Sequence, residues 1–230
     1  MERTNRVLIL YTGGTIGMRD TPRGPVLSPG LLEGLLASMP QFHDRTMPAL
    51  TTPLSRYGRR THYRIVEFDP LFESANMGVE DWVKIARAIE DAYDDHDAFI
   101  VLHGTDTMAY TASALSFMLE NLGKSVILTG AQIPVAEARN DAIDNILGAL
   151  TIASHYEIPE VCIYFNSRLL RGNRAQKTDA SGFAAFQSSN FPPLVEVGVD
   201  IRVEWQRILA PPNRPFRVAP VTERNVAALR

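Results

Sequence analysis

The chain has 230 residues, of which 45% are hydrophobic and 21% are charged, and its formal net charge is −3. This length and this balance predict one large domain with a packed core and exclude a disordered chain. The small net charge gives no electrostatic reason to expect a nucleic-acid or membrane partner, and we interpret the short basic run at residues 56–60 as a solvated loop.

Strand-like and helical segments alternate along the chain. Runs rich in Val, Ile, Leu and Phe predict buried parallel strands at residues 6–12, 63–68, 98–103, 125–129 and 160–165. The spacing of apolar residues predicts helices at residues 31–39, 80–93, 108–122 and 141–155. This alternation predicts an α/β fold of three layers, a mostly parallel sheet with helices on both faces.

Two of the predicted strands end in glycine-rich turns that carry threonine. Residues 11–17 read Tyr-Thr-Gly-Gly-Thr-Ile-Gly and place Thr15 after the first strand. Residues 103–107 read His-Gly-Thr-Asp-Thr and place Thr105 and Asp106 after the third. Ligands of an open α/β sheet bind at such ends, so we expect one site with two reactive hydroxyls. The alternatives are a tight turn at Thr15 and capping of the following helix by Asp106 or Thr107.

Further polar groups follow the other strands. Lys177 lies past the fifth strand, in a stretch that alone is typical of a charged surface loop. Because a loop after a parallel strand emerges at the same edge of the sheet, we expect Lys177 beside Asp106, as a proton relay for a threonine hydroxyl. Ser74 and Asn76 suit the binding of a carboxylate, or serve as turn and cap residues. The backbone N–H of Ala131 is placed to donate to an oxyanion.

Several kinds of site find no support in the sequence. The glycine spacing matches neither the dinucleotide fingerprint nor the P-loop, and the histidines and acidic residues lack metal-ligand spacing. We therefore expect no metal and no cofactor. The single cysteine, Cys162, is predicted to be a small core residue, and His103 a buried imidazole with its hydrogen bonds satisfied, ahead of a ligand contact. Without a signal peptide or a membrane-spanning run, we expect a cytoplasmic protein.

Taken together, these motifs resemble the bacterial-type L-asparaginases, and most closely their cytoplasmic type I branch. The matching segments read YTGGTIGM at residues 11–18, HGTDTMAYTASALSFM at 103–118, LTGAQIP at 128–134 and RGNRAQK at 171–177. The resemblance covers nearly the whole chain, about residues 5–220.

The resemblance implies a hydrolase that converts L-asparagine and water to L-aspartate and ammonia without a metal or cofactor. It implies that Thr15 is the nucleophile of an acyl-enzyme, and that Thr105, Asp106 and Lys177 form a second triad in which Thr105 assists the attack of water. Asp106 would also hold the α-ammonium group of the substrate. The residues implied for binding the α-carboxylate and the oxyanion are Ser74, Ala75, Asn76, Thr105 and Ala131.

The resemblance also implies a smaller C-terminal domain and a site completed by a neighbouring subunit. We expect residues 1–203 to be the N-terminal α/β domain, 204–220 a proline-rich interdomain linker, and 221–230 the start of a C-terminal domain that the sequence otherwise lacks. A homo-oligomer, dimer or tetramer, is expected if that domain is supplied. Some members carry a tyrosine on the loop after the first threonine motif, where the nearest position here is Pro25.

Two other functions stay open on the sequence alone. One is a truncated domain that binds an amino acid with little turnover. The other is the amidase subunit of a tRNA-dependent amidotransferase, which usually carries an extra domain before the first threonine motif, whereas only about five residues precede the first strand here. The sequence ranks neither asparagine against glutamine nor the presence of allosteric control.

Overall fold

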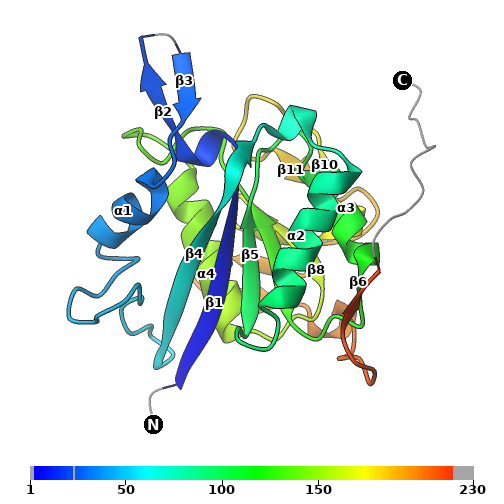
Figure 1. Cartoon of the computed structure of the whole chain (residues 1–230). Coiled ribbons are helices and arrows are strands. Elements are labelled where there is room, and N and C mark those ends of the chain that lie inside the picture. Colours follow the sequence, from blue (N-terminus) through cyan, green and yellow to red (C-terminus); the bar gives the residue numbers. More distant parts are fainter. Residues whose placement is uncertain (1–2, 23, 220–230) are drawn as a thin grey trace.

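One mixed sheet organises the chain (Figure 1). The computed structural model describes residues 3–22 and 24–219, and within them the main sheet has eight strands in the order β13-β12-β9-β8-β7-β5-β1-β4. The parallel strands are β1 (Arg3–Gly13), β4 (Arg59–Phe72), β5 (Ala98–Leu102), β7 (Ser125–Thr129) and β8 (Val161–Phe165). The antiparallel extension comprises β9 (Arg168–Arg171), β12 (Val195–Val197) and β13 (Ile201–Val203).

Helices cover both faces of this sheet, which confirms the predicted three layers. The helices are α1 (Leu31–Ser38), α2 (Val79–Asp91), α3 (Met108–Met118) and α4 (Ala142–His155). In Figure 1, α2 lies in front of the sheet and α4 behind it. Alternate residues of β1 point to opposite faces. Val7 and Ile9 pack in the core that α1 and α4 cover, whereas Leu8 and Leu10 pack in the core under α2 and α3.

The strand order creates a crevice at one edge of the sheet. From β1 the chain adds β4 on one side and then crosses back to add β5 on the other. The loops that follow β1 and β5 therefore leave the sheet side by side, at a point where the winding direction changes. This topological switch point is where open α/β sheets bind ligands.

Helix α3 is shorter than predicted. It ends at Met118, because Leu119 adopts φ −90° and ψ 77° and begins β6 (Leu119–Glu120), which pairs with β14 (Arg217–Val218). The predicted helix to residue 122 was wrong in its last turn. The partner strand lies in the proline-rich segment, where the Phe216 ring also stacks on Tyr93 at 3.8 Å between centroids. The domain boundary at residue 203 stays a prediction, and residues 221–230 lie outside the described part.

Two small hairpins lie at the carboxyl edge of the sheet. The first, β2 (Met18–Thr21) with β3 (Gly24–Leu27), projects from the body of the molecule (Figure 1). Its strand β3 contains Pro25, whose side chain lies outside the described part. The second pairs β10 (Gln176–Lys177) with β11 (Phe186–Gln187).

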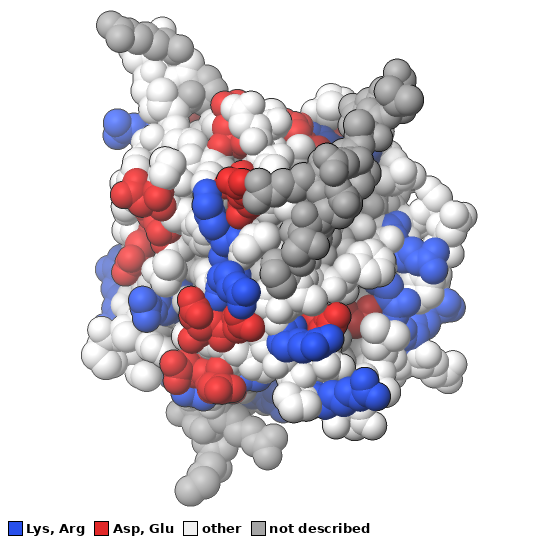
Figure 2. Space-filling view, turned by 45° about the vertical axis from the view of Figure 1, so that its right-hand side comes forward, with Lys and Arg blue, Asp and Glu red and all other residues white. Residues whose placement is uncertain are grey.

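On the face shown in Figure 2, basic and acidic residues are intermingled and form no large patch of one sign. Among the described residues, no helix has the length and apolar character needed to cross a bilayer.

A buried ion pair ties the antiparallel extension to β8. The Arg171 guanidinium donates to both carboxylate oxygens of Glu160, at 2.5 Å to Oε2 and 2.9 Å to Oε1. Glu160 is 4% exposed, and its Oε1 also accepts the backbone N–H of Leu209 at 2.7 Å. The carboxylate is therefore fully dependent on protein donors.

Replacing Arg171 by Met should lower the free energy of unfolding by about 3–5 kcal/mol, because it leaves the Glu160 carboxylate buried and uncompensated. Arg202→Met is the matched control, since its partner Glu196 is 40% exposed and such a pair contributes about 1 kcal/mol or less. Denaturant unfolding of both variants measures the two losses. Equal losses would contradict the assigned role of the buried pair.

Candidate active site

Glycines bring the loops after β1, β4 and β5 into contact. A Cβ added to Gly14 would lie 2.4 Å from the Cα of Gly104, and one added to Gly104 would lie 2.3 Å from the Ser74 hydroxyl oxygen. No residue with a side chain fits such an approach without displacing its neighbour. The two backbones therefore meet directly, and the residues that follow them, Thr15 and Thr105, stand at the switch point of the sheet.

Thr15 opens a short 3₁₀ turn, η1 (Thr15–Gly17), and is partly exposed. The turn is anchored below, because Ile16 is buried and its carbonyl accepts the Val135 N–H at 3.1 Å. The Thr15 hydroxyl itself forms no hydrogen bond with any residue in the described part of the chain. The tight-turn alternative therefore accounts for the backbone but leaves the hydroxyl available to a ligand.

The Lys177 ammonium holds the second threonine. Its Nζ donates to Thr105 Oγ1 and to Asp106 Oδ1, both at 2.8 Å. Because an ammonium only donates, the Thr105 hydroxyl accepts from Lys177 and donates to Gln132 Oε1, 3.2 Å away. The Lys177 side chain is 16% exposed and that of Asp106 is 67% exposed. The lysine is thus sheltered, while the carboxylate faces solvent.

Lys177 reaches this edge by another route than predicted. The chain does not emerge from β8 as a loop, because Asn166 and Ser167 have φ 46° and 63° and make a tight turn into β9. Two consecutive positive φ angles are the geometry of a two-residue hairpin. The chain then passes under α3 through η3 (Gly172–Arg174) and returns in β10.

The segment after β4 forms a second 3₁₀ turn, η2 (Ser74–Asn76). Ser74 is buried and its carbonyl accepts the Thr107 hydroxyl at 2.7 Å, so Thr107 makes no side-chain cap for α3. Ala75 and Asn76 are exposed. The Asn76 N–H already donates to the Glu73 carbonyl at 2.9 Å. The Asn76 side chain has no hydrogen-bond partner among the described residues, so the side chain, and not the N–H, is open to a ligand.

Two backbone N–H groups at neighbouring strand ends lack an acceptor. They belong to Thr105, after β5, and to Ala131, after β7, and neither meets an acceptor within residues 3–22 and 24–219. Both residues are buried, at 7% and 1% exposure. Gly130 packs against the backbone of the β5 end, since a Cβ there would lie 2.3 Å from the His103 carbonyl oxygen. Such paired free donors are suited to stabilise negative charge on an oxygen.

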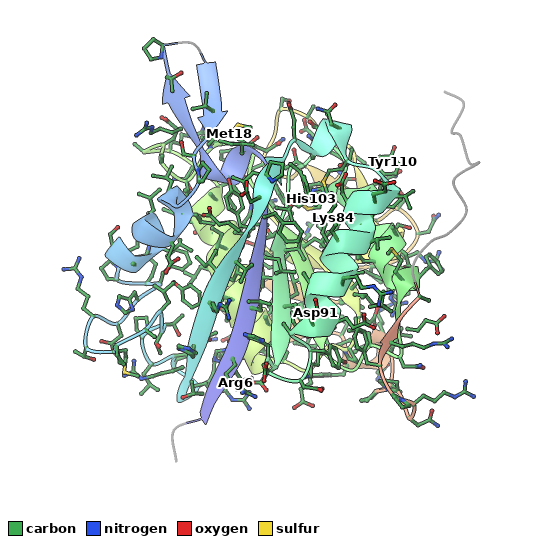
Figure 3. All side chains as sticks on the ribbon, viewed as in Figure 1. Arg6, Met18, Lys84, Asp91, His103 and Tyr110 are labelled. Carbon is green, nitrogen blue, oxygen red and sulfur yellow. The ribbon has the colours of Figure 1, made fainter. Side chains whose placement is uncertain are left out.

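His103 lies at the carboxyl end of β5, and Arg6 lies at the opposite end of the sheet (Figure 3). The Gly104 carbonyl only accepts, so His103 Nδ1 carries the proton and donates to it at 2.7 Å. In the neutral ring Nε2 then accepts the Thr111 hydroxyl at 2.8 Å, and Thr111 Oγ1 in turn accepts the indole N–H of Trp82 at 3.0 Å. The imidazole is therefore a satisfied, neutral core group, and burial lowers its pKa to about 4.

Other expectations about ionisable groups concern the core. Cys162 is buried as predicted, and burial raises the pKa of its thiol, which leaves it a poor nucleophile. No group of three His, Cys, Asp or Glu side chains suited to a metal ion occurs in the part of the chain that is described.

Sequence reasoning missed the residues that support the loop after β7. The Asp141 carboxylate accepts the N–H groups of Gln132 and Ile133, each at 3.0 Å, and the Asn145 amide donates to the Gly130 carbonyl at 3.0 Å. Asp141 looked like the start of a helix only. The available signal was the spacing of Asp141 and Asn145, which puts both on one face of the first turn of α4.

Comparison with known proteins gives consistent matches. The family model "Asparaginase, N-terminal" matches residues 6–209. L-asparaginase 1 of Escherichia coli K12 is 52% identical over 206 residues, which are 90% of this chain and 56% of that protein. The 60 kDa lysophospholipase of Homo sapiens is 48% identical over 212 residues, 88% of this chain and 37% of that protein.

Among solved structures, L-asparaginase I from Vibrio cholerae superposes with a TM-score of 0.83 at 46% identity, over 96% of this chain and 62% of that one. The chain therefore spans about half the length of the E. coli relative, 56% of it.

Replacing Gly14 by Ala should disrupt this site, because the new Cβ meets the Gly104 backbone. Gly58→Ala is the matched control: Gly58 also has positive φ, +71° against +85°, but nothing lies within 4 Å of an added Cβ. We expect each variant to lose about 1–3 kcal/mol from backbone strain, and Gly14→Ala to lose clearly more. Thermal or denaturant unfolding measures both. Equal losses would mean that the loops need not touch.

His103 should make stability depend on pH. An unfolded imidazole binds its proton below about 6.5, whereas folded His103 binds it only near pH 4. The stability contributed by the neutral ring is thus complete above pH 6.5 and falls by about 3 kcal/mol as the pH drops to 4. Denaturant unfolding between pH 7 and 4.5 gives the free energy of unfolding at each pH. For His103→Gln this free energy should fall less steeply as the pH drops than for the wild type. An unchanged dependence on pH would contradict the burial argument.

Proposed function

The chain belongs to the asparaginase family, and from this premise we propose that it carries the nucleophile of an enzyme that hydrolyses L-asparagine to L-aspartate and ammonia. One observation carries the proposal. The Thr15 hydroxyl, which has no hydrogen-bond partner among the described residues, lies on a turn that adjoins the turn of Thr105, and Thr105 is held by the sheltered Lys177. The two free N–H groups of Thr105 and Ala131 support the same acyl-transfer chemistry.

In the first half-reaction, Thr15 Oγ1 attacks the side-chain amide carbon of asparagine. The carbonyl oxygen becomes an oxyanion, which accepts hydrogen bonds from the N–H groups of Thr105 and Ala131. The C–N bond then breaks, and the hydroxyl proton of Thr15 ends on the departing nitrogen, which leaves as ammonia. The aspartyl group stays on Thr15 as an ester.

In the second half-reaction, water adds to the ester carbon. The Thr105 hydroxyl is held by the Lys177 ammonium and by Gln132, and it orients the attacking water, which gives up one proton as it adds. The new C–O bond forms, the bond to Thr15 Oγ1 breaks, and a proton returns to Thr15. The sum is asparagine plus water giving aspartate plus ammonia.

Substrate is held by its α-groups. We assign the α-ammonium to Asp106, whose carboxylate is exposed and uses Oδ1 for Lys177. The α-carboxylate is assigned to the Ser74 hydroxyl, the Ala75 N–H and the Asn76 side-chain amide. Both groups are bonded to the α-carbon of the substrate. An acid and a set of neutral donors therefore hold this end of the molecule and orient its side-chain amide toward Thr15.

The rest of the proposal follows the family. We propose that the protein is cytoplasmic and uses no cofactor. We also propose a homo-oligomer in which a neighbouring subunit completes the site. Glutamine, longer by one methylene, stays an alternative substrate, because a single methylene changes discrimination by only about 10–200-fold.

Thr15→Ala should lower ammonia release from L-asparagine by at least about 10³-fold, since no other group replaces the nucleophile. Thr46→Ala, on a surface loop, is the control and should keep full activity. Both variants should show wild-type unfolding curves.

Ammonia release is also measured with L-glutamine. Release of fatty acid is measured with lysophosphatidylcholine, a member of the substrate class in the name of the human relative. Full activity of Thr15→Ala on asparagine would overturn the nucleophile assignment. Release of fatty acid without release of ammonia would overturn the substrate.

A further inference from the structure

Asn145 is a buried amide on the first turns of α4 that no part of the reaction above uses. It is 2% exposed. Its Nδ2 donates to the Gly130 carbonyl at 3.0 Å and to Asp141 Oδ2 at 3.2 Å, and its Oδ1 accepts the N–H of Asn166 at 3.1 Å. Carbonyls and carboxylates only accept, and a backbone N–H only donates, so these three partners admit one orientation of the amide.

Asp141 completes a cradle around the loop after β7. Its carboxylate accepts the N–H groups of Gln132 and Ile133, while also accepting the Asn145 amide. Each N–H of the run 131–133 is thereby accounted for except that of Ala131. The cradle fixes the backbone on both sides of this group and leaves it alone unpaired.

The geometry of the peptide bond means that the bond from Asn145 to the Gly130 carbonyl also fixes the direction of the Ala131 N–H. The Gly130 carbonyl and the Ala131 N–H belong to one planar trans peptide, so they point in opposite directions. Because Asn145 holds the carbonyl toward α4, the N–H points away from α4. Gly130 packs on the backbone of the β5 end at His103, two residues before Thr105, so the loop that carries this N–H adjoins the loop that carries Thr105.

We propose that Asn145, oriented by Asp141, is a positioning residue that aims the Ala131 N–H at the oxyanion of the reaction. The inference rests on the proposed function, which makes this N–H an oxyanion donor. It adds that the direction of the donor is set by a side chain on the far side of the peptide, which never touches the substrate.

A merely structural role makes a different prediction. If Asn145 only joined α4 to the β8–β9 turn through Asn166, its loss would lower stability and leave the chemistry of the folded protein intact. If it aims the donor, its loss lowers kcat in the folded protein while ground-state binding of the substrate stays the same, because the oxyanion exists only beyond the ground state.

The experiment compares Asn145→Asp with wild type and with Asn140→Ala. The aspartate keeps the shape and the acceptor for Asn166 but replaces the donor to Gly130 by an acceptor. Asn140 is the matched control, because its side chain bonds the Glu137 carbonyl and the Ile143 N–H near the same end of α4 and bonds none of residues 130–133. Asn145→Leu is a second variant that removes the donor without adding charge.

For either Asn145 variant we expect kcat on L-asparagine to fall about 10–100-fold, somewhat less than complete removal of an oxyanion donor. KM and the calorimetric affinity for L-aspartate should stay within about 3-fold, as expected when only transition-state binding is lost. Asn140→Ala should keep wild-type kcat. A kcat within twofold of wild type in both Asn145 variants, or an equal loss in Asn140→Ala, overturns the proposal.

The amide resonance of Ala131 separates this inference from the proposed function. In ¹H–¹⁵N spectra it should shift in the Asn145 variants and stay in place in Asn140→Ala. If the wild type releases no ammonia, the proposed function falls, and this resonance alone decides whether Asn145 sets the direction of the N–H. An unmoved resonance refutes the inference whatever the activity.

Discussion

Direct contact between backbones at the carboxyl edge of the sheet is the constraint on which the rest of the structure depends. Gly14, Gly104 and Gly130 each lie where an added Cβ would fall within 2.4 Å of a neighbouring loop. These contacts put Thr15 and Thr105 on adjoining turns. Side chains larger than hydrogen at these positions would keep the loops after β1, β4, β5 and β7 apart. The glycines allow the backbones to approach closely, and the threonines provide the hydroxyl groups of the site.

Around this contact, hydrogen bonds divide the polar groups into two sets. Groups behind the loops are fully paired, as in the chain from Trp82 to Gly104 and in the cradle of Asp141 and Asn145. Groups at the crevice, namely the Thr15 hydroxyl and the N–H groups of Thr105 and Ala131, have no partner among the described residues. The paired groups hold the loops rigid, so the N–H donors of Thr105 and Ala131 are already in position before negative charge develops on the substrate oxygen.

The sequence predicted what depends on local pattern and missed what depends on distant partners. The strand at residues 125–129 was predicted to the residue, because its centre at residues 126–128 is the kind of apolar run typical of a buried strand. The end of α3 was missed because β14, almost a hundred residues later, draws Leu119 into a strand. The route to Lys177 depends on the positive φ of Asn166 and Ser167. The role of Asn145 was missed because its partners Gly130 and Asn166 lie in other parts of the fold.

The most direct measurement is peptide mass mapping after acid quenching during turnover of L-asparagine, with Lys177→Met included so that deacylation slows and the ester accumulates. The account predicts an aspartyl adduct on Thr15 that is absent from Thr15→Ala. An adduct on Thr105, or steady ammonia release without an adduct on Thr15 in either protein, would contradict it.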